Sequence, residues 1–354
     1  MNYLIGELTN DRVLVDEKGI DELYKTGYFG RPKNDKLELS LVEAAYLLYR
    51  NKVNIQEKGN TLDFTDFFKK ASLRQQYFEL KYIVYKDIRE RGLYIQPGVT
   101  DFRVYPRGGH PGKSQAKSFI RVHSERITLP LKELQKLLNT ADNVHKQLIL
   151  AIVDEESDIT FYEVKKVNVK GQMGALYPDL KTSASLLEDR VIVWNSESSN
   201  TIHESGFYGK LLDPERLQLS LVESGYLLEN GVIRISDREN GIDLNFNEFS
   251  KRSSSIEPEF PLKCRVYSDL RNRGLVPKTG FKFGTHFRVY KQVESVDKIP
   301  HSEYLVHALS KDYEFILPVM SRAIRLANSV KKRMLFAVES GKGFEYIDIG
   351  RVKM

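Results

Sequence analysis

Apolar and polar residues alternate along this chain with two different periods, which predicts a protein that mixes helices and strands. Near residue 40 the sequence Ser-Leu-Val-Glu precedes an apolar stretch, and the same four residues recur near residue 220. A serine followed by a glutamate three positions later forms a capping box, because the two side chains satisfy backbone N–H groups at a helix start. Ser40 with Glu43, and Ser220 with Glu223, therefore predict the beginnings of two apolar helices.

Strands and two further helices are predicted near the end of the chain. The strand candidates are rich in β-branched and aromatic residues, and they are HFRVY (286–290), EYLVHAL (303–309) and MLFAVE (334–339). The segment VYSDLRNRGL (266–275) has the pattern of an amphipathic helix that stops near Gly274. Another helix is predicted from about Pro318 to Arg333, since apolar residues share one face at helical spacing: Val319, Ala323, Leu326, Ala327, Val330 and Met334.

The chain repeats itself. Four pairs of segments match in the same order: DRVLV (11–15) with DRVIV (189–193), LELSLVEAAYLL (37–48) with LQLSLVESGYLL (217–228), VYKDIRERGL (84–93) with VYSDLRNRGL (266–275), and DFRVY (101–105) with HFRVY (286–290). The offset between the copies grows from 178 to 185 residues, which indicates small loop insertions in the second copy. Because this period is far too long for a solenoid, we interpret the chain as one fold used twice, at about 1–166 and 186–354.

The predicted fold class is α/β (mixed α+β) in tandem duplication. Each repeat is expected to have an N-terminal α/β subdomain and a C-terminal subdomain of mixed sheet flanked by helices. The expected subdomain boundaries are 1–80 and 81–166 in the first repeat, and 188–262 and 263–354 in the second. A linker is expected at 167–187, where Gly, Pro and Ser occur with little periodicity.

Composition narrows the class of protein. The chain is 41% hydrophobic and 29% charged, which is typical of a soluble globular protein. Its single cysteine, Cys264, excludes an intrachain disulfide framework and cysteine-based zinc clusters, and fits a cytoplasmic location. Glu7 and Asp11 make the start of the chain unlike a signal peptide, and no apolar run has the length of a membrane span. The net charge of +6 is compatible with a polyanionic partner but does not identify one.

The two copies differ where chemistry is expected. The second copy has Tyr290 at the end of a strand, His301 before the next strand, and Lys332 late in the predicted helix. The offsets place Tyr105, Ala116 and Lys146 at these positions in the first copy, and Asn139 at the position of Arg325. Arg322, Arg325 and Lys332 fall opposite the apolar face of the predicted helix. A solvated basic face is the commoner interpretation of such a helix; the nearby tyrosine and histidine favour a functional one.

These residues carry a resemblance to a known family. The runs KTGFKFGTHFRVY (278–290), IPHSEYLVHAL (299–309) and RLANSVKKR (325–333) resemble the archaeal tRNA-splicing endonuclease, in its homodimeric two-repeat class. The resemblance covers essentially the whole chain. It implies a pseudo-catalytic first repeat, a catalytic second repeat with nuclease-like C-terminal subdomain, and catalytic positions at Tyr290, His301 and Lys332. One departure is His286, where the family usually has the aspartate that the first copy keeps as Asp101.

The resemblance implies RNA cleavage without a metal or another cofactor. Tyr290 would act as general base towards the 2′-hydroxyl, His301 as general acid towards the 5′-oxygen, and Lys332 would stabilise the phosphorane. The products would be a 2′,3′-cyclic phosphate and a 5′-hydroxyl. A free tyrosine has a pKa of about 10, so nearby cations would have to lower it, and Lys332 is the expected cation.

The implied substrate is precursor tRNA with a bulge–helix–bulge at the exon–intron junctions. Unpaired RNA bases are commonly stacked on aromatic or guanidinium planes. Arg325 resembles the family arginine that clamps a bulge base, and Arg351 is a weaker candidate for its partner. Lys331 and Arg322 are expected to contact phosphate, which positions RNA without specifying its sequence.

A homodimer is expected, because two bulges need two sites and one chain supplies one complete site. The final hairpin of the first copy is acidic, whereas that of the second is nearly free of acid. In the family an acidic loop of the pseudo-catalytic repeat docks on the partner's catalytic repeat. The residues that would do so are Asp154, Glu155, Glu156 and Asp158; an ordinary solvated hairpin is the alternative.

Two rival functions remain open from the sequence. The first is a Mg²⁺-dependent nuclease, since Glu339-Ser-Gly-Lys342 faintly resembles the E-x-K of such enzymes and Asp297 could be an upstream carboxylate. Two-metal chemistry needs clustered carboxylates, and few lie near Tyr290 in the sequence. The second is a catalytically inactive RNA-binding scaffold.

Overall fold

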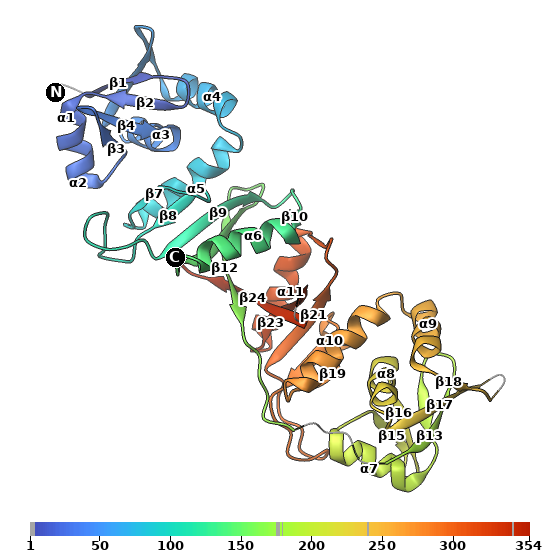
Figure 1. Cartoon of the computed structure of the whole chain (residues 1–354). Helices are drawn as coiled ribbons and strands as arrows, with labels where there is room; N and C mark the ends of the chain where they lie inside the picture. Colours follow the sequence, from blue (N-terminus) through green and yellow to red (C-terminus); the bar gives the residue numbers. More distant parts are fainter. Residues whose placement is uncertain (1–3, 175–177, 179, 239–240, 342) are drawn as a thin grey trace. The chain divides into compact units, whose positions relative to one another are not determined.

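The structure is a computed structural model that describes residues 4–174, 178, 180–238, 241–341 and 343–354. The chain divides into two compact units (Figure 1). The first unit comprises Met1–Lys165 with Glu314–Met320 and Gly350–Met354, and the second comprises Lys166–Tyr313 with Ser321–Ile349. Each unit therefore contains most of one repeat, and two short segments of the second repeat belong to the first unit.

The first unit begins with a six-stranded sheet in the order β3-β4-β2-β1-β5-β6. Strands β1 and β5 are parallel, whereas the other neighbours are antiparallel. The elements are β1 (Leu4–Leu8), β2 (Arg12–Val15), the continuous helical segment α1 (Glu17–Gly19), η1 (Ile20–Tyr24) and α2 (Lys25–Gly27), then β3 (Arg31–Lys33), β4 (Lys36–Ser40), α3 (Leu41–Tyr49), β5 (Val53–Glu57), β6 (Asn60–Leu62) and α4 (Phe64–Arg74). The predicted capping box at Ser40 and Glu43 is present at the start of α3.

The second unit begins with a sheet of the same order, β15-β16-β14-β13-β17-β18. Its elements are β13 (Thr182–Leu186), β14 (Val191–Val193), α7 (Ser196–Gly206), β15 (Lys210–Asp213), β16 (Arg216–Leu219), α8 (Leu221–Glu229), β17 (Ile233–Asp237), β18 (Asp243–Leu244) and α9 (Phe246–Ile256). The capping box at Ser220 and Glu223 is also present. Strand β13 lies within 167–187, so this part of the expected linker belongs to the sheet, where it pairs with β14 and β17. We propose a correspondingly shorter linker.

The C-terminal subdomain of the first repeat places a mixed sheet between two helices. Its elements are α5 (Phe78–Glu90), β7 (Ile95–Pro97), β8 (Phe102–Val104), β9 (Ser118–Ser124), β10 (Leu129–Pro130), α6 (Leu131–Asp142), β11 (Gln147–Val153) and β12 (Ile159–Val167). Strands β7, β8 and β9 are antiparallel neighbours, and β9 is parallel to β11 across α6. A parallel pair requires such a crossover connection, because the chain must return to the same end of the sheet.

The second repeat has the same arrangement. Its elements are α10 (Phe260–Asn272), β19 (Val276–Thr279), η2 (Phe281–Phe283), β20 (Phe287–Tyr290), β21 (Tyr304–Leu309), β22 (Glu314–Phe315), α11 (Leu317–Ser329), β23 (Arg333–Ser340) and β24 (Gly343–Val352). Strands β19, β20 and β21 are antiparallel, and β21 is parallel to β23. Both α5 and α10 begin before the boundaries expected at residues 80 and 262. The predicted α/β fold in tandem duplication is confirmed.

The apolar face predicted for α11 was partly wrong: Ala327 and Met334 are buried as expected, but Val319, Leu326 and Val330 are not. The helix ends at Ser329, and its buried residues are Leu317, Met320, Ile324 and Ala327. Val319, Leu326 and Val330, predicted to be buried, are 51%, 40% and 37% exposed. Two apolar stripes coexist on this segment, and only packing decides which of them is covered.

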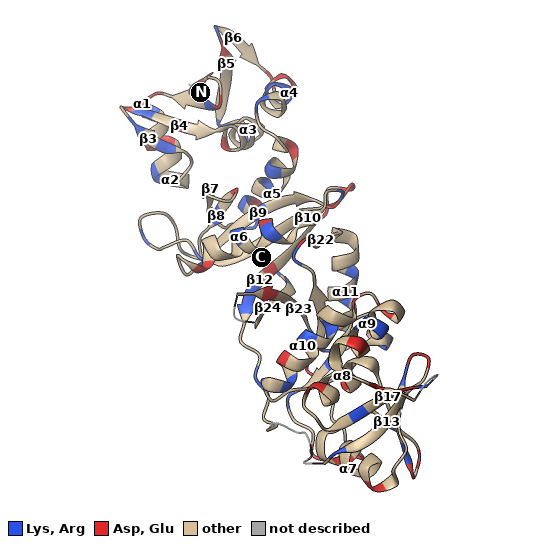
Figure 2. Cartoon of the chain, turned by 45° about the vertical axis from the view of Figure 1, so that its right-hand side comes forward, with Lys and Arg blue, Asp and Glu red and all other residues tan. Residues whose placement is uncertain are grey.

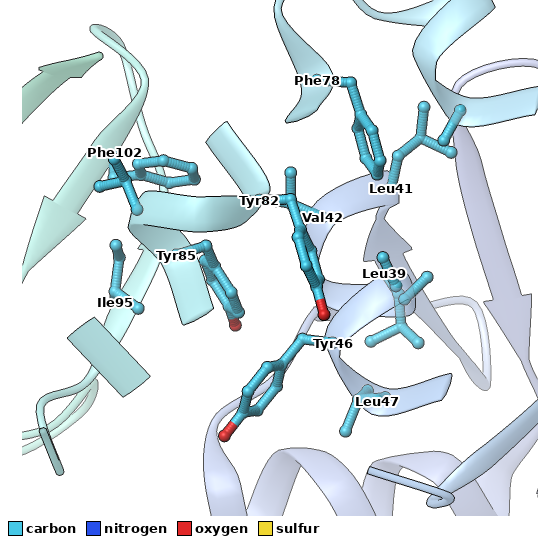
Figure 3. Close-up of a cluster of buried hydrophobic side chains, with 14 of the residues drawn as sticks. Leu39, Leu41, Val42, Tyr46, Leu47, Phe78, Tyr82, Tyr85, Ile95 and Phe102 are labelled. Atoms are coloured by element: carbon cyan, nitrogen blue, oxygen red, sulfur yellow. The ribbon is translucent and has the colours of Figure 1, made fainter. Parts of the chain in front are cut away.

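Aromatic side chains join the two subdomains within each unit. In the first unit, Tyr85 of α5 lies between Tyr46 of α3 and Phe102 of β8, with ring centroids 5.8 Å apart on both sides (Figure 3). In the second unit, Tyr267 lies in the same way between Tyr226 and Phe287, at 5.7 and 6.0 Å. Such aromatic contacts stabilise a core beyond the burial of their area, so they help to hold the two subdomains of each unit together.

No helix among the described residues is long and apolar enough to cross a membrane. Lys and Arg are interspersed with Asp and Glu along both units (Figure 2). Net charge therefore does not locate a functional site, and the site must be built from particular side chains.

Candidate active site

Tyr290 ends β20, and the antiparallel pairing of β20 with β21 determines what lies beside it. The backbone N–H of Glu303 donates to the carbonyl of Val289 at 3.1 Å. The end of β20 therefore lies next to the residues that lead into β21, which are His301 and Ser302.

Lys332 reaches the same place from the other neighbour of β21. Strand β23 runs parallel to β21 and begins directly after Lys332. The Lys332 Nζ donates to the carbonyl of Ser302 at 2.7 Å, and the lysine is buried. His301 precedes Ser302 and is exposed. The strand register thus brings Tyr290, His301 and Lys332, the three residues singled out from the sequence, to one end of the sheet.

The first repeat shows which residue replaces the histidine. The matching strand pairs are Val104 with Ser118 and Val289 with Tyr304. Counting back three residues from Ser118 and from Tyr304 gives Gln115 and His301. The expectation that Ala116 matches His301 was wrong. The connection from Val289 to Tyr304 is one residue longer than that from Val104 to Ser118, so the offset between the two copies rises from 185 to 186 before His301. The Lys146 Nζ donates to Gln115 Oε1 at 2.9 Å.

The electrostatic surroundings of Tyr290 differ from the expectation. Burial raises the pKa of Tyr290 above its ordinary value; the guanidinium of Arg288 opposes this rise, and Glu303 adds to it. The Arg288 guanidinium carbon lies 5.9 Å from the centroid of the Tyr290 ring. The cation that favours the phenolate is therefore Arg288, whereas the sequence pointed to Lys332.

The candidate RNA-binding residues fall into two groups. Arg322 and Arg325 are exposed on α11, and Lys331 is exposed just beyond its end. Lys331 has a left-handed backbone conformation, with φ of 56°, that terminates the helix. Lys332 follows this turn, so it does not share a helix face with Arg325 as predicted. Arg351 belongs to Gly350–Met354, a segment of the first unit, and the second unit therefore does not bring it together with Arg325.

His286 replaces an acidic ion-pair centre. In the first repeat, Asp101 accepts a hydrogen bond from the Val122 N–H at 2.9 Å and pairs with Lys81 at 3.1 Å and Arg121 at 3.5 Å. In the second repeat, His286 Nδ1 accepts from the Ala308 N–H at 3.1 Å. The role of the aspartate as acceptor for the neighbouring strand is thus preserved by a neutral imidazole.

A second histidine, His307, replaces the arginine that pairs with the aspartate in the first repeat. His307 occupies the position that matches Arg121, and its ring stacks on that of His286 with centroids 4.0 Å apart. Burial lowers the pKa of His286 to about 3, with smaller effects from His307 and Lys263. Burial also lowers the pKa of His307, again with help from Lys263. Both rings are neutral at neutral pH, which separates them from the proton transfer expected of His301.

The acidic hairpin connects β11 and β12. Asp154 is used within the turn, where its Oδ1 accepts from the N–H groups of Glu156 at 3.0 Å and Asp158 at 2.8 Å. Glu155 forms an ion pair with Arg126. The carboxylates of Glu156 and Asp158 are exposed. Two of the four residues singled out from the sequence are therefore well placed for a partner, and Asp154 primarily shapes the loop.

The residues of the rival metal site are engaged or dispersed. Glu339 forms ion pairs with Arg265 and Lys311, which lie on the same unit. Asp297 is exposed in the loop between β20 and β21. Lys342 lies outside the described residues. No group of three or more His, Cys, Asp or Glu side chains that could hold a metal ion occurs among the residues that the structure describes.

Two residues near Tyr290 were missed by the sequence reasoning. Arg288 is part of the F-R-V-Y run that both copies share, so a comparison of the copies does not single it out. Lys278 does differ between the copies, since Gln96 takes its place in the first repeat. That difference was available in the sequence, but its meaning depends on which strand residues face each other.

Both domains of one family are found twice in this chain. The family model described as the tRNA intron endonuclease N-terminal domain matches residues 4–68 and 182–250. The model for the catalytic C-terminal domain matches 78–161 and 260–346. The matches coincide with the subdomains of both repeats.

Curated relatives match along the whole length. The chain is 62% identical to a tRNA-splicing endonuclease of Methanococcoides burtonii over 350 residues, 99% of each chain. It is 62% identical to that of Methanosarcina mazei over 354 residues, 100% of each chain. The tRNA-splicing endonuclease of Halobacterium salinarum is 36% identical over 349 residues, 94% of each chain. The chain therefore belongs to the tRNA intron endonuclease family of enzymes.

Proposed function

We propose that this enzyme cleaves precursor tRNA at both intron boundaries by attack of the RNA's own 2′-hydroxyl. The proposal is supported by the strand register, which puts the backbone positions of Tyr290, His301 and Lys332 at one end of the second repeat's sheet, and by the hydrogen bond from Lys332 to the Ser302 carbonyl. The first repeat lacks the histidine at the matching position, where Gln115 accepts a hydrogen bond from Lys146. Chemistry thus belongs to the second repeat alone.

In the proposed reaction the 2′-oxygen attacks phosphorus while the bond from phosphorus to the 5′-oxygen breaks. Tyr290 takes the proton of the 2′-hydroxyl, and His301 gives a proton to the departing 5′-oxygen. Lys332 supplies positive charge to the phosphorane, and its hydrogen bond to the Ser302 carbonyl holds it beside His301. The products are a 2′,3′-cyclic phosphate and a 5′-hydroxyl. All three groups are side chains of this protein, so the scheme uses no metal.

Recognition of a bulge–helix–bulge is assigned to α11. Arg325 and Arg322 expose guanidinium groups on the helix that leads to Lys332, and Lys331 is exposed between them and the site. A guanidinium plane can stack on an unpaired base. We assign the base contact to Arg325 and phosphate contacts to Arg322 and Lys331. Arg351 has no role in this scheme, because it belongs to the first unit whereas Arg325 belongs to the second.

Cleavage of an intron-containing precursor tRNA is expected to continue in excess EDTA. The fragments downstream of each cut should carry 5′-hydroxyls, so that polynucleotide kinase labels them without phosphatase treatment. The upstream fragments should carry cyclic phosphates, detected by mass spectrometry. Loss of cleavage in EDTA with recovery on addition of Mg²⁺ would instead establish the metal-dependent alternative. Binding without cleavage under all conditions would establish the inactive scaffold.

We further propose that the active form is a homodimer, because each chain supplies one complete site and an intron has two boundaries. Glu156 and Asp158 are exposed on the hairpin, and their negative charges suit a basic pocket on a partner. Leu326 of α11 and Val330, just beyond the end of this helix, are partly exposed apolar residues.

Neutralising the hairpin by E155Q, E156Q and D158N together is expected to convert the dimer into a monomer. The mass measured by light scattering should fall from twice 40.9 kDa to 40.9 kDa, and cleavage should fall with it. Asp154 is left intact, because it shapes the turn. The matched control is E17Q, E22Q and D35N, which removes the same charge at exposed positions of the first unit. A dimer with full activity in the hairpin variant would contradict the proposal.

A further inference from the structure

The first repeat locks the tyrosine that matches Tyr290. The Tyr105 hydroxyl donates to Gln96 Oε1 at 3.1 Å, in a buried hydrogen bond. The Arg103 guanidinium donates to the same oxygen at 2.9 Å. The Gln96 Oε1 therefore accepts hydrogen bonds from both Tyr105 and Arg103.

The strand register identifies the matching residues of the second repeat. Gln96 faces Arg103 across β7 and β8, and Lys278 faces Arg288 across β19 and β20. The tyrosine follows the arginine by two residues in both copies. The second repeat therefore has a lysine where the first has a glutamine, while the arginine and the tyrosine are the same in both.

Lys278 forms its hydrogen bonds with residues of the N-terminal subdomain. Its Nζ donates to the Gly209 carbonyl at 3.0 Å and to Glu223 Oε1 at 3.3 Å. The two side chains are only 14% and 8% exposed. Burial lowers the pKa of Lys278 although Glu223 opposes the change. Burial would raise the pKa of Glu223, but Lys278 and the N–H donors of Ser220 and Gly209 outweigh it, so that this pKa is lowered.

An ammonium group cannot replace the glutamine oxygen, because it has no acceptor. Within the part of the chain that the structure describes, neither the Tyr290 hydroxyl nor the Arg288 guanidinium has a hydrogen-bond partner. The Arg288 Nε is buried without one. The Nε of Arg103 in the first repeat is likewise buried without a partner, but the Nη2 group of Arg103 donates to Gln96 Oε1. The catalytic repeat therefore leaves unoccupied the two groups that its inactive copy ties together.

We propose that Lys278, held by Glu223, is a positioning residue that keeps Tyr290 and Arg288 free for the RNA. Its exchange for glutamine is a second difference, besides the histidine, that separates an active repeat from an inactive one. Arg288 supplies the positive charge beside Tyr290 when the tyrosine takes the proton of the 2′-hydroxyl. This inference rests on the proposed function, in which Tyr290 is the general base.

The test is the variant K278Q compared with K278M. Both remove the buried ion pair with Glu223 and should destabilise the protein alike, but only glutamine offers an acceptor to Tyr290 and Arg288. The single-turnover cleavage rate of K278Q is expected to be about tenfold below that of K278M. The reason is that the hydrogen bond from the Tyr290 hydroxyl to the new glutamine stabilises the resting enzyme and has to break before the tyrosine can act as a base. The pH–rate profile of K278Q should move to higher pH, since the bond favours the protonated tyrosine. The KM should be similar in the two variants.

Equal rates and pH profiles for K278Q and K278M, with H301A inactive, would overturn this inference and leave the proposed function intact. Cleavage by H301A at the normal rate would overturn the proposed function itself.

The variant R288M provides a second, independent test. Both Lys278 variants leave Glu223 buried without its cation, whereas R288M changes a half-buried residue that does not pair with Glu223. It should shift the pH–rate profile upwards, with partial recovery in R288K. A wild-type profile in R288M would contradict the role of Arg288. Q96K in the first repeat is the matched control and should cleave normally.

Discussion

The variant H301A is expected to lose cleavage of precursor tRNA by a factor of about 10²–10⁴ while keeping its affinity for the RNA, because general acid catalysis contributes that range. His301 is exposed next to Ser302, whose carbonyl accepts a hydrogen bond from Lys332, so the imidazole is accessible to a substrate. Single-turnover rates and filter binding with the same labelled substrate separate the two quantities.

The matched control is H286D, which installs the aspartate that the first repeat has at this position. His286 is a neutral, buried acceptor for the Ala308 N–H, a role that an aspartate fills at Asp101. The H286D variant should therefore cleave at nearly the wild-type rate. If H301A cleaved normally, or if it lost binding and cleavage together, His301 would not be the general acid.

Acidification is expected to destabilise the second unit through the stacked pair of His286 and His307. Burial lowers both pKa values below the ordinary 6.5, to about 3 for His286. The unfolded chain therefore binds protons first as the pH falls below 6.5, and stability is lost progressively between there and the folded pKa. For His286 alone this amounts to about 2 kcal/mol at pH 5. Urea denaturation at pH 7.5 and at about pH 5 measures the loss.

The groups around the pair set the direction of this effect. Glu259 lies 3.5 Å from His286 Nε2 and is largely exposed, so it is a weak partner for a protonated ring. Lys263 opposes protonation of both histidines, and Glu257 pairs with that lysine. The double variant H286D/H307R restores the charges of Asp101 and Arg121, and between pH 6.5 and 5 it should lose less stability than the wild type. An equal loss in both proteins would show that these histidines do not govern it.

The sequence comparison of the two copies predicted much of the fold correctly. The capping boxes at Ser40 and Ser220 are formed, and the three strands expected near the end of the chain are β20, β21 and β23. These predictions were correct because helix capping and strand formation depend mainly on residues that are close together in the sequence. The buried face of α11 failed for the opposite reason: the choice between Ile324 and Leu326 as a buried residue depends on what covers the helix.

The sequence alone determined that one fold is used twice, that the second copy carries Tyr290, His301 and Lys332, and that the first lacks the histidine. Local matches and their order are sufficient for such statements. Only the tertiary structure decided that Gln115 replaces the histidine, that Lys332 bonds to the Ser302 carbonyl, and that Arg288 is the cation beside Tyr290. These relations join residues on different strands. A shift of one residue in a loop changes which of them meet, and strand register is settled only when the sheet is packed.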